Sequence, residues 1–243
     1  MSKLKIVAFL FFLIFALKSH DVFTADWRTA NREPAGIAPI AENHPEAIVQ
    51  VYAARAFSWR GYFSVHSWIA IKKTDAKEYK VYQVLGWRSR YNQPVLSIET
   101  EHPDRYWFNN RPEVIRDIRG VRAGEIIRNL ENIVDLYPYK NHYVLWPGPN
   151  SNTFTAWVGR KIPELRLELP SIAIGKDFLG TGFFSTAPSR TGYQVSIFGI
   201  FGILLARDEG LEINVAGLVF GVDPLELSLK LPLFGKVGFL NQQ

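Results

Sequence analysis

Cysteine is absent from the 243 residues of this chain. The absence excludes disulfides, thiolate metal sites and cysteine nucleophiles, although it leaves the redox compartment open. Histidine is scarce as well, because the five histidines are scattered without an H-x-x-x-H pair or a His/Asp cluster. We therefore expect no bound metal and no cofactor.

Long blocks of basic residues are also missing. The formal net charge is +5, but no Lys/Arg-rich stretch with interleaved aromatic residues forms a nucleic-acid stripe, so we expect no nucleic-acid partner. From Leu169 onward, five Lys and Arg stand against six acids. The basic excess therefore lies in the first two thirds of the chain, where it favours solubility or attraction to anionic lipid.

The N-terminus carries a long apolar run. Lys3 and Lys5 precede "IVAFLFFLIFAL", and Lys18 closes it. These twelve residues would span only about 18 Å as a helix, short of the roughly 30 Å hydrocarbon core of a membrane. The pattern is typical of a secretory signal peptide, but Phe23 stands where a cleavage site prefers a small residue. Residues 1–25 are thus predicted to be a signal peptide or an uncleaved signal-anchor, and the protein is expected to be exported, either periplasmic or anchored to the inner membrane.

The rest of the chain has the composition of an ordinary globular protein, with 47% hydrophobic and 21% charged residues. Three prolines and a glycine without periodicity mark residues 26–46 as a linker or arm. We expect an α+β domain at 47–168 and an apolar, β-rich extension packed on it at 169–243.

Periodicity predicts the elements of the domain. Strands are expected at 47–56, 64–73, 78–87 and 94–99, and in the second His66, Trp68 and Ala70 share one face. Pro112 suits the start of a helix that Gly120 interrupts, and apolar residues from 123 to 137 recur at helical spacing until Pro138. A strand at 142–146 and a short helix at 151–161 should follow. The predicted fold class is α+β, with a mixed or mostly antiparallel sheet and two or three helices.

The last third changes character. "YQVSIFGIFGILLA" and "LEINVAGLVFGV" are apolar, glycine-interrupted runs joined by the turn "RDEG". We expect a hairpin that is apolar on both faces and must be covered by protein, by a partner or by lipid.

The stretch "WPGPNSNTF" places Ser151 in the first turn of a predicted helix. Unpaired N–H groups and the helix dipole at such a position stabilise a nucleophile and an oxyanion, and His66 on a preceding strand could act as general base. The alternative is that Asn150 and Ser151 are simply helix caps. On the catalytic hypothesis, His66 and Ser151 are the reacting pair, and Asn150 and Asn152 are the oxyanion or capping residues.

Two resemblances accompany these residues. "NSNTF" is similar to the Asn-Cys-Asn helix start of circularly permuted papain-like enzymes, which include the NlpC/P60 peptidases and lecithin:retinol acyltransferase, with Ser151 in the cysteine position. The set "VQVYAAR", "HSWIAIK", "WPGPNSNTF", "ELPSIAIGKDF" and "FGVDPLEL" resembles an uncharacterised family, a domain of unknown function, from Gram-negative bacteria. The first resemblance implies a permuted papain-like shape, and neither implies a known activity.

Three functional hypotheses remain open. The first is a non-catalytic binding or structural protein of the cell envelope, with an envelope glycan or peptide as partner; a cluster of its tryptophans could bind glycan or lipid. The second is a serine-variant hydrolase or acyltransferase that acts on an envelope amide or ester. The third is lipid handling by the apolar C-terminal hairpin, with a membrane surface or lipid as partner. The oligomeric state stays undetermined.

Overall fold

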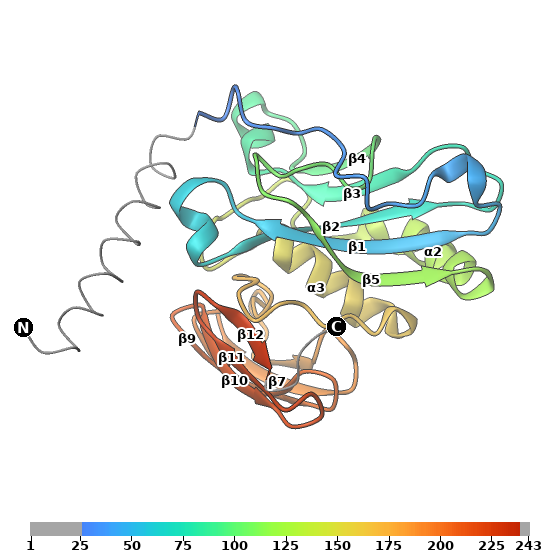
Figure 1. Ribbon diagram of the computed structural model, residues 1–243. Coiled ribbons are helices and arrows are strands. Elements are labelled where there is room, and N and C mark those ends of the chain that lie inside the picture. The colour runs from blue at the N-terminus through green and yellow to red at the C-terminus, as the bar shows by residue number, and fades with distance from the viewer. Residues whose placement is uncertain (1–25, 239–243) are drawn as a thin grey trace, which may run out of the picture.

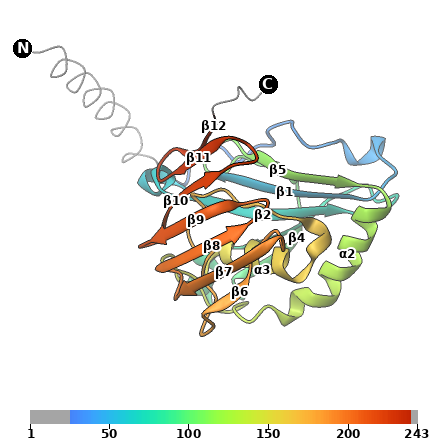
Figure 2. The same cartoon turned by 90° about the horizontal axis from the view of Figure 1, so that it is seen from below.

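The computed structural model describes residues 26–238, and these form three layers (Figure 1). A five-stranded sheet lies on one side and a seven-stranded sheet on the other (Figures 1 and 2). One α-helix lies between the two sheets, and a second covers the same face of the five-stranded sheet beside the seven-stranded one (Figure 2). The expectations for residues 1–25 fall outside the described residues. The α+β fold class is confirmed, and both the sheet of the domain and the β region after it are antiparallel.

The five-stranded sheet is antiparallel throughout, in the order β4-β3-β2-β1-β5. Its strands are β1 (Ile48–Arg55), β2 (Val65–Lys72), β3 (Lys80–Val84), β4 (Leu96–Thr100) and β5 (Glu113–Arg119). The first four confirm the strands expected from alternation. Strand β2 also has the predicted faces, because Trp68 and Ala70 pack in one apolar cluster and Val65, Ile69 and Ile71 in another.

Strand β5 corrects the sequence prediction, which began a helix near Pro112. Residues 113–119 instead pair with the free edge of β1, from Ala53 opposite Glu113 to Ile48 opposite Arg119. The free edge of β1 offers unpaired backbone N–H and C=O groups along its length. Hydrogen bonds to these groups outweigh the local preference for a helix start at Pro112. Gly120 then adopts a positive φ of 70° and turns the chain into the helix.

Helices α2 (Val121–Ile133) and α3 (Ser151–Lys161) cover one face of this sheet. Ala123, Ile126, Ile127 and Leu130 are buried on α2, as the helical spacing predicts. Phe154 on α3 is fully buried in the same cluster. No α-helix in the described part of the chain is long and apolar enough to cross a membrane.

The expected strand at 142–146 does not form, and the chain there is a loop whose backbone pairs locally and not with a neighbouring strand. In this loop the Val144 N–H donates to the Pro149 carbonyl over 2.8 Å. Short 3₁₀ helices fill other connections: η1 (Ala41–Asn43), η2 (Ser58–Tyr62), η3 (Gly86–Tyr91), η4 (Val134–Leu136) and η5 (Pro163–Leu165).

Residues 26–46 run across the outer face of the five-stranded sheet, the face away from the helices (Figure 1). The N–H groups of Ile37 and Ala38 donate to Asp104 Oδ2 over 2.7 and 3.1 Å, and the Tyr79 hydroxyl donates to the Pro39 carbonyl. Hydrogen bonds to the domain thus fix this predicted arm in place.

The last third of the chain forms a seven-stranded antiparallel meander in place of a single hairpin (Figure 2). In chain order its strands are β6 (Phe184–Thr186), β7 (Gly192–Ile197), β8 (Phe201–Ala206), β9 (Gly210–Val215), β10 (Leu218–Asp223), β11 (Ser228–Leu231) and β12 (Gly235–Gly238).

The two faces of this sheet differ, which corrects the expectation that both are apolar. The inward face carries buried polar side chains that include Gln194, Glu212, Asn214 and Lys230. Gln194 accepts a 2.6 Å hydrogen bond from Arg160 of α3, so the polar face is the one that packs against the rest of the molecule.

A buried network of ion pairs connects this inward face to the segment before the sheet. Glu212 accepts from Lys176 at one carboxylate oxygen and from Lys230 over 2.8 Å at the other. Lys230 also donates to Glu168 and to the Glu209 carbonyl, over 2.9 and 2.7 Å. Burial alone would raise the pKa of Glu212, but the two ammonium groups hold it below its usual value.

Glu212→Gln should lower the free energy of unfolding by about 3–5 kcal/mol, because two buried lysines would then share a neutral amide. Urea titration followed by circular dichroism measures the loss. Glu131→Gln breaks the exposed Lys73–Glu131 pair and should cost less than about 1 kcal/mol. Equal losses in the two variants would contradict the central role of this network.

Candidate functional site

Ser151 begins α3 as predicted, but Asn150 caps the helix. The Asn150 Oδ1 accepts from the N–H groups of Asn152 and Thr153 over 3.0 and 3.2 Å, and the Asn150 N–H donates to Thr153 Oγ1. The Asn152 N–H, which the catalytic hypothesis assigns to an oxyanion, is therefore already engaged by the cap.

The neighbouring polar side chains join α3 to the rest of the domain. Asn152 Nδ2 donates to the carbonyls of Val65 and Ile174, each over 2.9 Å, and its Oδ1 accepts from Ser67 over 2.8 Å. Asn150 Nδ2 likewise donates to Ile174 over 3.0 Å. Asn152 thus connects the helix start to strand β2, and both asparagines connect it to the segment after residue 170.

The structure does not bring His66 and Ser151 together. Consecutive residues of a strand point to opposite faces, and Ser67 points to α3 through Asn152 and Thr155. His66 therefore points to the opposite, outer face of the sheet, where it stacks on Trp107 with ring centroids 3.5 Å apart. The Ser–His pair expected from the order along the chain is not formed, because the strand that carries the imidazole turns it away from the helix.

His66 has the environment of a packed, neutral imidazole. Burial lowers its pKa to about 3, and a hydrogen bond from its ring to Gln83 offsets only part of that effect. Gln83 Nε2 donates to Glu101 over 2.7 Å, so its Oε1 is the atom that lies 3.3 Å from His66 Nε2, and the imidazole must donate there. At neutral pH this histidine fixes the Trp107 ring and the Gln83 amide.

Around this stack lies a hollow that the sequence reasoning did not identify. It has a volume of about 250 Å³ and opens on the outer face of the five-stranded sheet. Aromatic residues form part of its wall, and two carboxylates and three arginines supply most of its charge. We call it the aromatic hollow; the residues used below are Trp87, Trp107, Phe108, Glu99, Glu101, Arg32, Arg88 and Arg105.

The carboxylates of the hollow are held by neighbours. Glu101 accepts from Gln83 at one oxygen and from Arg105 over 2.8 Å at the other. Glu99 accepts from Ser97 over 2.7 Å and from Arg88 over 2.6 Å at a single oxygen. The Ser97 hydroxyl, followed by the Arg88 guanidinium, holds the pKa of Glu99 below its usual value, so this group is an ionised acceptor at neutral pH. The spacing of Glu99 and Glu101, two residues apart at the end of a predicted strand, was the available signal for this site.

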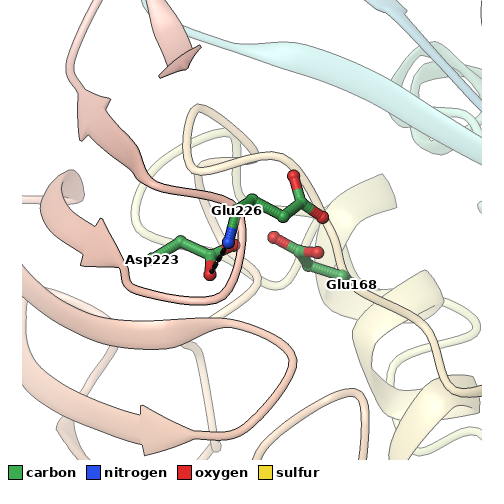
Figure 3. A group of neighbouring side chains, drawn as sticks. All are labelled: Glu168, Asp223 and Glu226. Atoms are coloured by element: carbon green, nitrogen blue, oxygen red, sulfur yellow. Dashed lines mark hydrogen bonds between the residues drawn. The ribbon is translucent and has the colours of Figure 1, made fainter. Parts of the chain in front are cut away.

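A second group of acids lies at the seven-stranded sheet (Figure 3). One carboxylate oxygen from each of Glu168, Asp223 and Glu226 lies within 4.8 Å of the others. The Lys236 ammonium lies 3.2, 2.7 and 2.7 Å from these three residues in that order. The Lys236 ammonium thus pairs with all three carboxylates, and Lys230 pairs with Glu168 as well, so the geometry is that of an ion-pair network.

The outward face of the seven-stranded sheet is an uncovered apolar surface. Three rows of paired residues cross it and all are apolar, for example Val195, Ile203, Ile213 and Phe220 on adjacent strands. We call this the outward apolar face; its side chains are each between 37% and 66% exposed, and they are Tyr193, Val195, Ile197, Phe201, Ile203, Leu205, Leu211, Ile213, Val215, Phe220, Val222, Leu229 and Val237.

Comparison with known proteins identifies the family. A family model described as "Protein of unknown function (DUF3750)" matches residues 46–178, more than half of the chain. The chain belongs to the DUF3750 family. This confirms the resemblance to an uncharacterised family, whereas the papain-like resemblance gains no support. The DUF3750 match includes the five-stranded sheet and both α-helices and ends before β6. No curated protein and no solved structure matches the chain.

Asn150→Ala should destabilise the protein by about 2 kcal/mol or more, because it removes a cap and leaves buried N–H and C=O groups without partners. Ser151→Ala should cost less than about 1 kcal/mol, since no described residue hydrogen-bonds to that hydroxyl. Chemical unfolding measures both. A fluorophosphonate probe should not label Ser151, and labelling that disappears in Ser151→Ala would restore the nucleophile hypothesis.

The burial of His66 predicts a pH dependence of stability. The unfolded imidazole takes up a proton near pH 6.5 and the folded one only near pH 3, so His66 should destabilise the fold progressively as the pH falls between these values. His66→Phe should reduce this slope in urea midpoints measured from pH 7 to pH 4. Gln83→Leu removes the hydrogen bond but keeps the imidazole, and should retain the slope. An unchanged slope in His66→Phe would show that the imidazole is protonated in the folded state.

Proposed function

We propose that this protein is a non-catalytic binding protein of the cell envelope that docks on a lipid surface through its outward apolar face. The observation that carries the proposal is the reversed polarity of the seven-stranded sheet. Its charged and amide side chains are buried against the molecule, and its aliphatic and aromatic side chains face away from it.

The size of the outward apolar face supports this role. The largest apolar patch on a typical soluble monomer covers about 300–600 Å², and larger ones mark interaction sites. Here uncovered apolar side chains continue over six adjacent strands, from Tyr193 on β7 to Val237 on β12. Each large aliphatic or aromatic side chain contributes about 1.5–3 kcal/mol when it is fully removed from water, so partial burial of many gives a large driving force.

The chemistry of the face favours lipid over a protein partner. Interfaces between proteins are only about 56–58% apolar, and those of homodimers about 65%, because polar groups give them register and specificity. The paired positions of the outward apolar face on β7 to β12 carry no charged side chain, and their side-chain polar atom is the Tyr193 hydroxyl. On β6, Thr186 opposite Tyr193 adds a second hydroxyl at the edge of the sheet. The hydrocarbon part of a lipid surface needs no polar groups to align it with the protein.

The apolar run at 6–17, flanked by lysines, provides a second membrane signal in the sequence. Stable attachment to a membrane generally takes two signals, and a tether also raises the effective concentration of the face at the bilayer. The proposed location is the periplasmic side of the inner membrane, with the sheet resting on the lipid.

The absence of cysteine makes a site-specific test simple. In the full chain, Ile213→Cys on the outward apolar face and Val121→Cys on α2, where the valine is 83% exposed, can each carry an environment-sensitive nitrobenzoxadiazole probe. With vesicles of phosphatidylethanolamine and phosphatidylglycerol, the probe at 213 should shift to the blue and brighten, and the probe at 121 should not. The comparison separates the face from the N-terminal run, which is common to both.

Two outcomes would overturn the proposal. One is a protein that binds the vesicles while the fluorescence of its probe at 213 keeps the wavelength and intensity seen in water. The other is a blue shift at 213 without lipid, together with a doubled mass in solution, which would assign the face to a second copy of the chain. Leu205→Glu in the labelled chain should weaken the shift at 213, since it places a charge within the face.

A further inference from the structure

The aromatic hollow lies at the opposite side of the molecule from the outward apolar face. It opens on the outer side of the five-stranded sheet, and α3 lies between that sheet and the seven-stranded one (Figures 1 and 2). A domain that rests on lipid through one side would therefore hold this hollow toward the aqueous space. The hollow shares no residue with the outward apolar face, so its function can be tested separately from lipid binding.

One wall of the hollow is a rigid aromatic platform. Trp107 is stacked between His66, at 3.5 Å, and Trp87, at 5.7 Å with an angle of 27° between the rings. Phe108 meets both indoles edge-on, at 5.0 and 5.9 Å, and the Arg32 guanidinium lies 4.3 Å above Phe108. Trp87 keeps 42% of its surface exposed, so a flat apolar group can still stack there at little cost in ordering.

The charged side chains Glu99, Glu101, Arg88 and Arg105 of the hollow form two carboxylate–guanidinium pairs. Glu101 with Arg105, and Glu99 with Arg88, each place an acceptor-only group beside a donor-only group. One Glu99 oxygen takes both the Ser97 and the Arg88 hydrogen bonds, and the other has no partner among the described residues. Each carboxylate is already paired with an arginine. The third arginine, Arg32, donates to the carbonyls of Ala30 and Trp27 and lies over the Phe108 ring, so the charged groups of the hollow are largely engaged within the protein.

A hydroxyl group both donates and accepts, so neighbouring hydroxyls match such carboxylate–guanidinium pairs. A sugar ring combines hydroxyls on its rim with a flat apolar face of C–H groups, which suits an exposed indole. Small-molecule pockets span about 300–1,000 Å³, so a hollow of about 250 Å³ suits a single ring.

From this combination we propose that the aromatic hollow binds one neutral sugar ring of a glycan, with Trp87 as the stacking surface and Glu99 and Arg88 as hydroxyl partners. The remainder of the glycan would extend into solvent. The ligand class is defined by the hydroxyls and the apolar ring face, and it requires no ionised group.

Saturation-transfer NMR on the full chain tests this, with D-glucose and N-acetyl-D-glucosamine as neutral probes and D-glucosamine and D-glucuronate as charged ones. Transfer to ring protons of at least one neutral sugar is expected. Trp87→Ala should weaken its binding by about tenfold or more, and Glu99→Gln should weaken it while leaving the stack in place. Trp59→Ala, which removes an indole of similar exposure outside the hollow, and Glu131→Gln, which breaks another exposed ion pair, should bind as the parent does.

Three results would overturn the proposal: no transfer to either neutral sugar, stronger transfer to glucosamine or glucuronate, or equal losses in the control variants. Circular dichroism of each variant confirms that it is folded, and Trp87→Phe, which keeps a smaller ring, should retain part of the binding. None of these results depends on vesicle binding, so the sugar site and the lipid face can fail independently.

Discussion

The carboxylate of Glu212, shared by the buried ammonium groups of Lys176 and Lys230, sets the orientation of the seven-stranded sheet. Buried charges require partners, and these partners come from the segment before the sheet as well as from the sheet itself. Glu168 and Lys176 precede β6, so the sheet can satisfy its lysines only with this face turned inward. Alternation along the strands then leaves the apolar residues on the other side. The outward apolar face is thus a consequence of how the inward face is neutralised.

The sequence predicted the strands of the first sheet because each is a short alternating run bounded by turns. It failed at 113–119, where the edge of β1 supplied hydrogen-bond partners that no local pattern reveals. The apolar character of the last third was also evident from the sequence, but which face of its sheet would be buried was not. Gln194, Glu212 and Asn214 lie among aliphatic residues, and a face with several buried polar groups becomes recognisable as the inside only when Arg160, Lys176 and Asp177 are seen to meet it.

The helix start at "NSNTF" shows the same limit at the candidate site. The sequence correctly placed Ser151 in the first turn of a helix and His66 on a strand beneath it. The pairing failed on a single step of strand periodicity, since Ser67 faces the helix and His66 faces away. The glutamates of the aromatic hollow were not predicted as a site, because they form one only together with Arg88 and Arg105. These arginines reach them from a 3₁₀ helix and a loop.

The three-layer arrangement relates the two proposed surfaces to each other. Asn152 links α3 to β2 and to the segment around Ile174, and Asn150 links it to Ile174 as well. Arg160 at the other end of the same helix donates to Gln194 of the seven-stranded sheet. Helix α3 is therefore hydrogen-bonded to both sheets and holds them in a fixed relation. A sheet seated on lipid would then present the aromatic hollow at a constant height and direction above the membrane. A shallow site that stacks one sugar ring binds weakly by itself, because few contacts must offset the cost of association. Fixing many copies on a surface lets such a site hold a polymer through repeated contacts, so the proposed sugar site would gain avidity from the proposed lipid face in the same molecule.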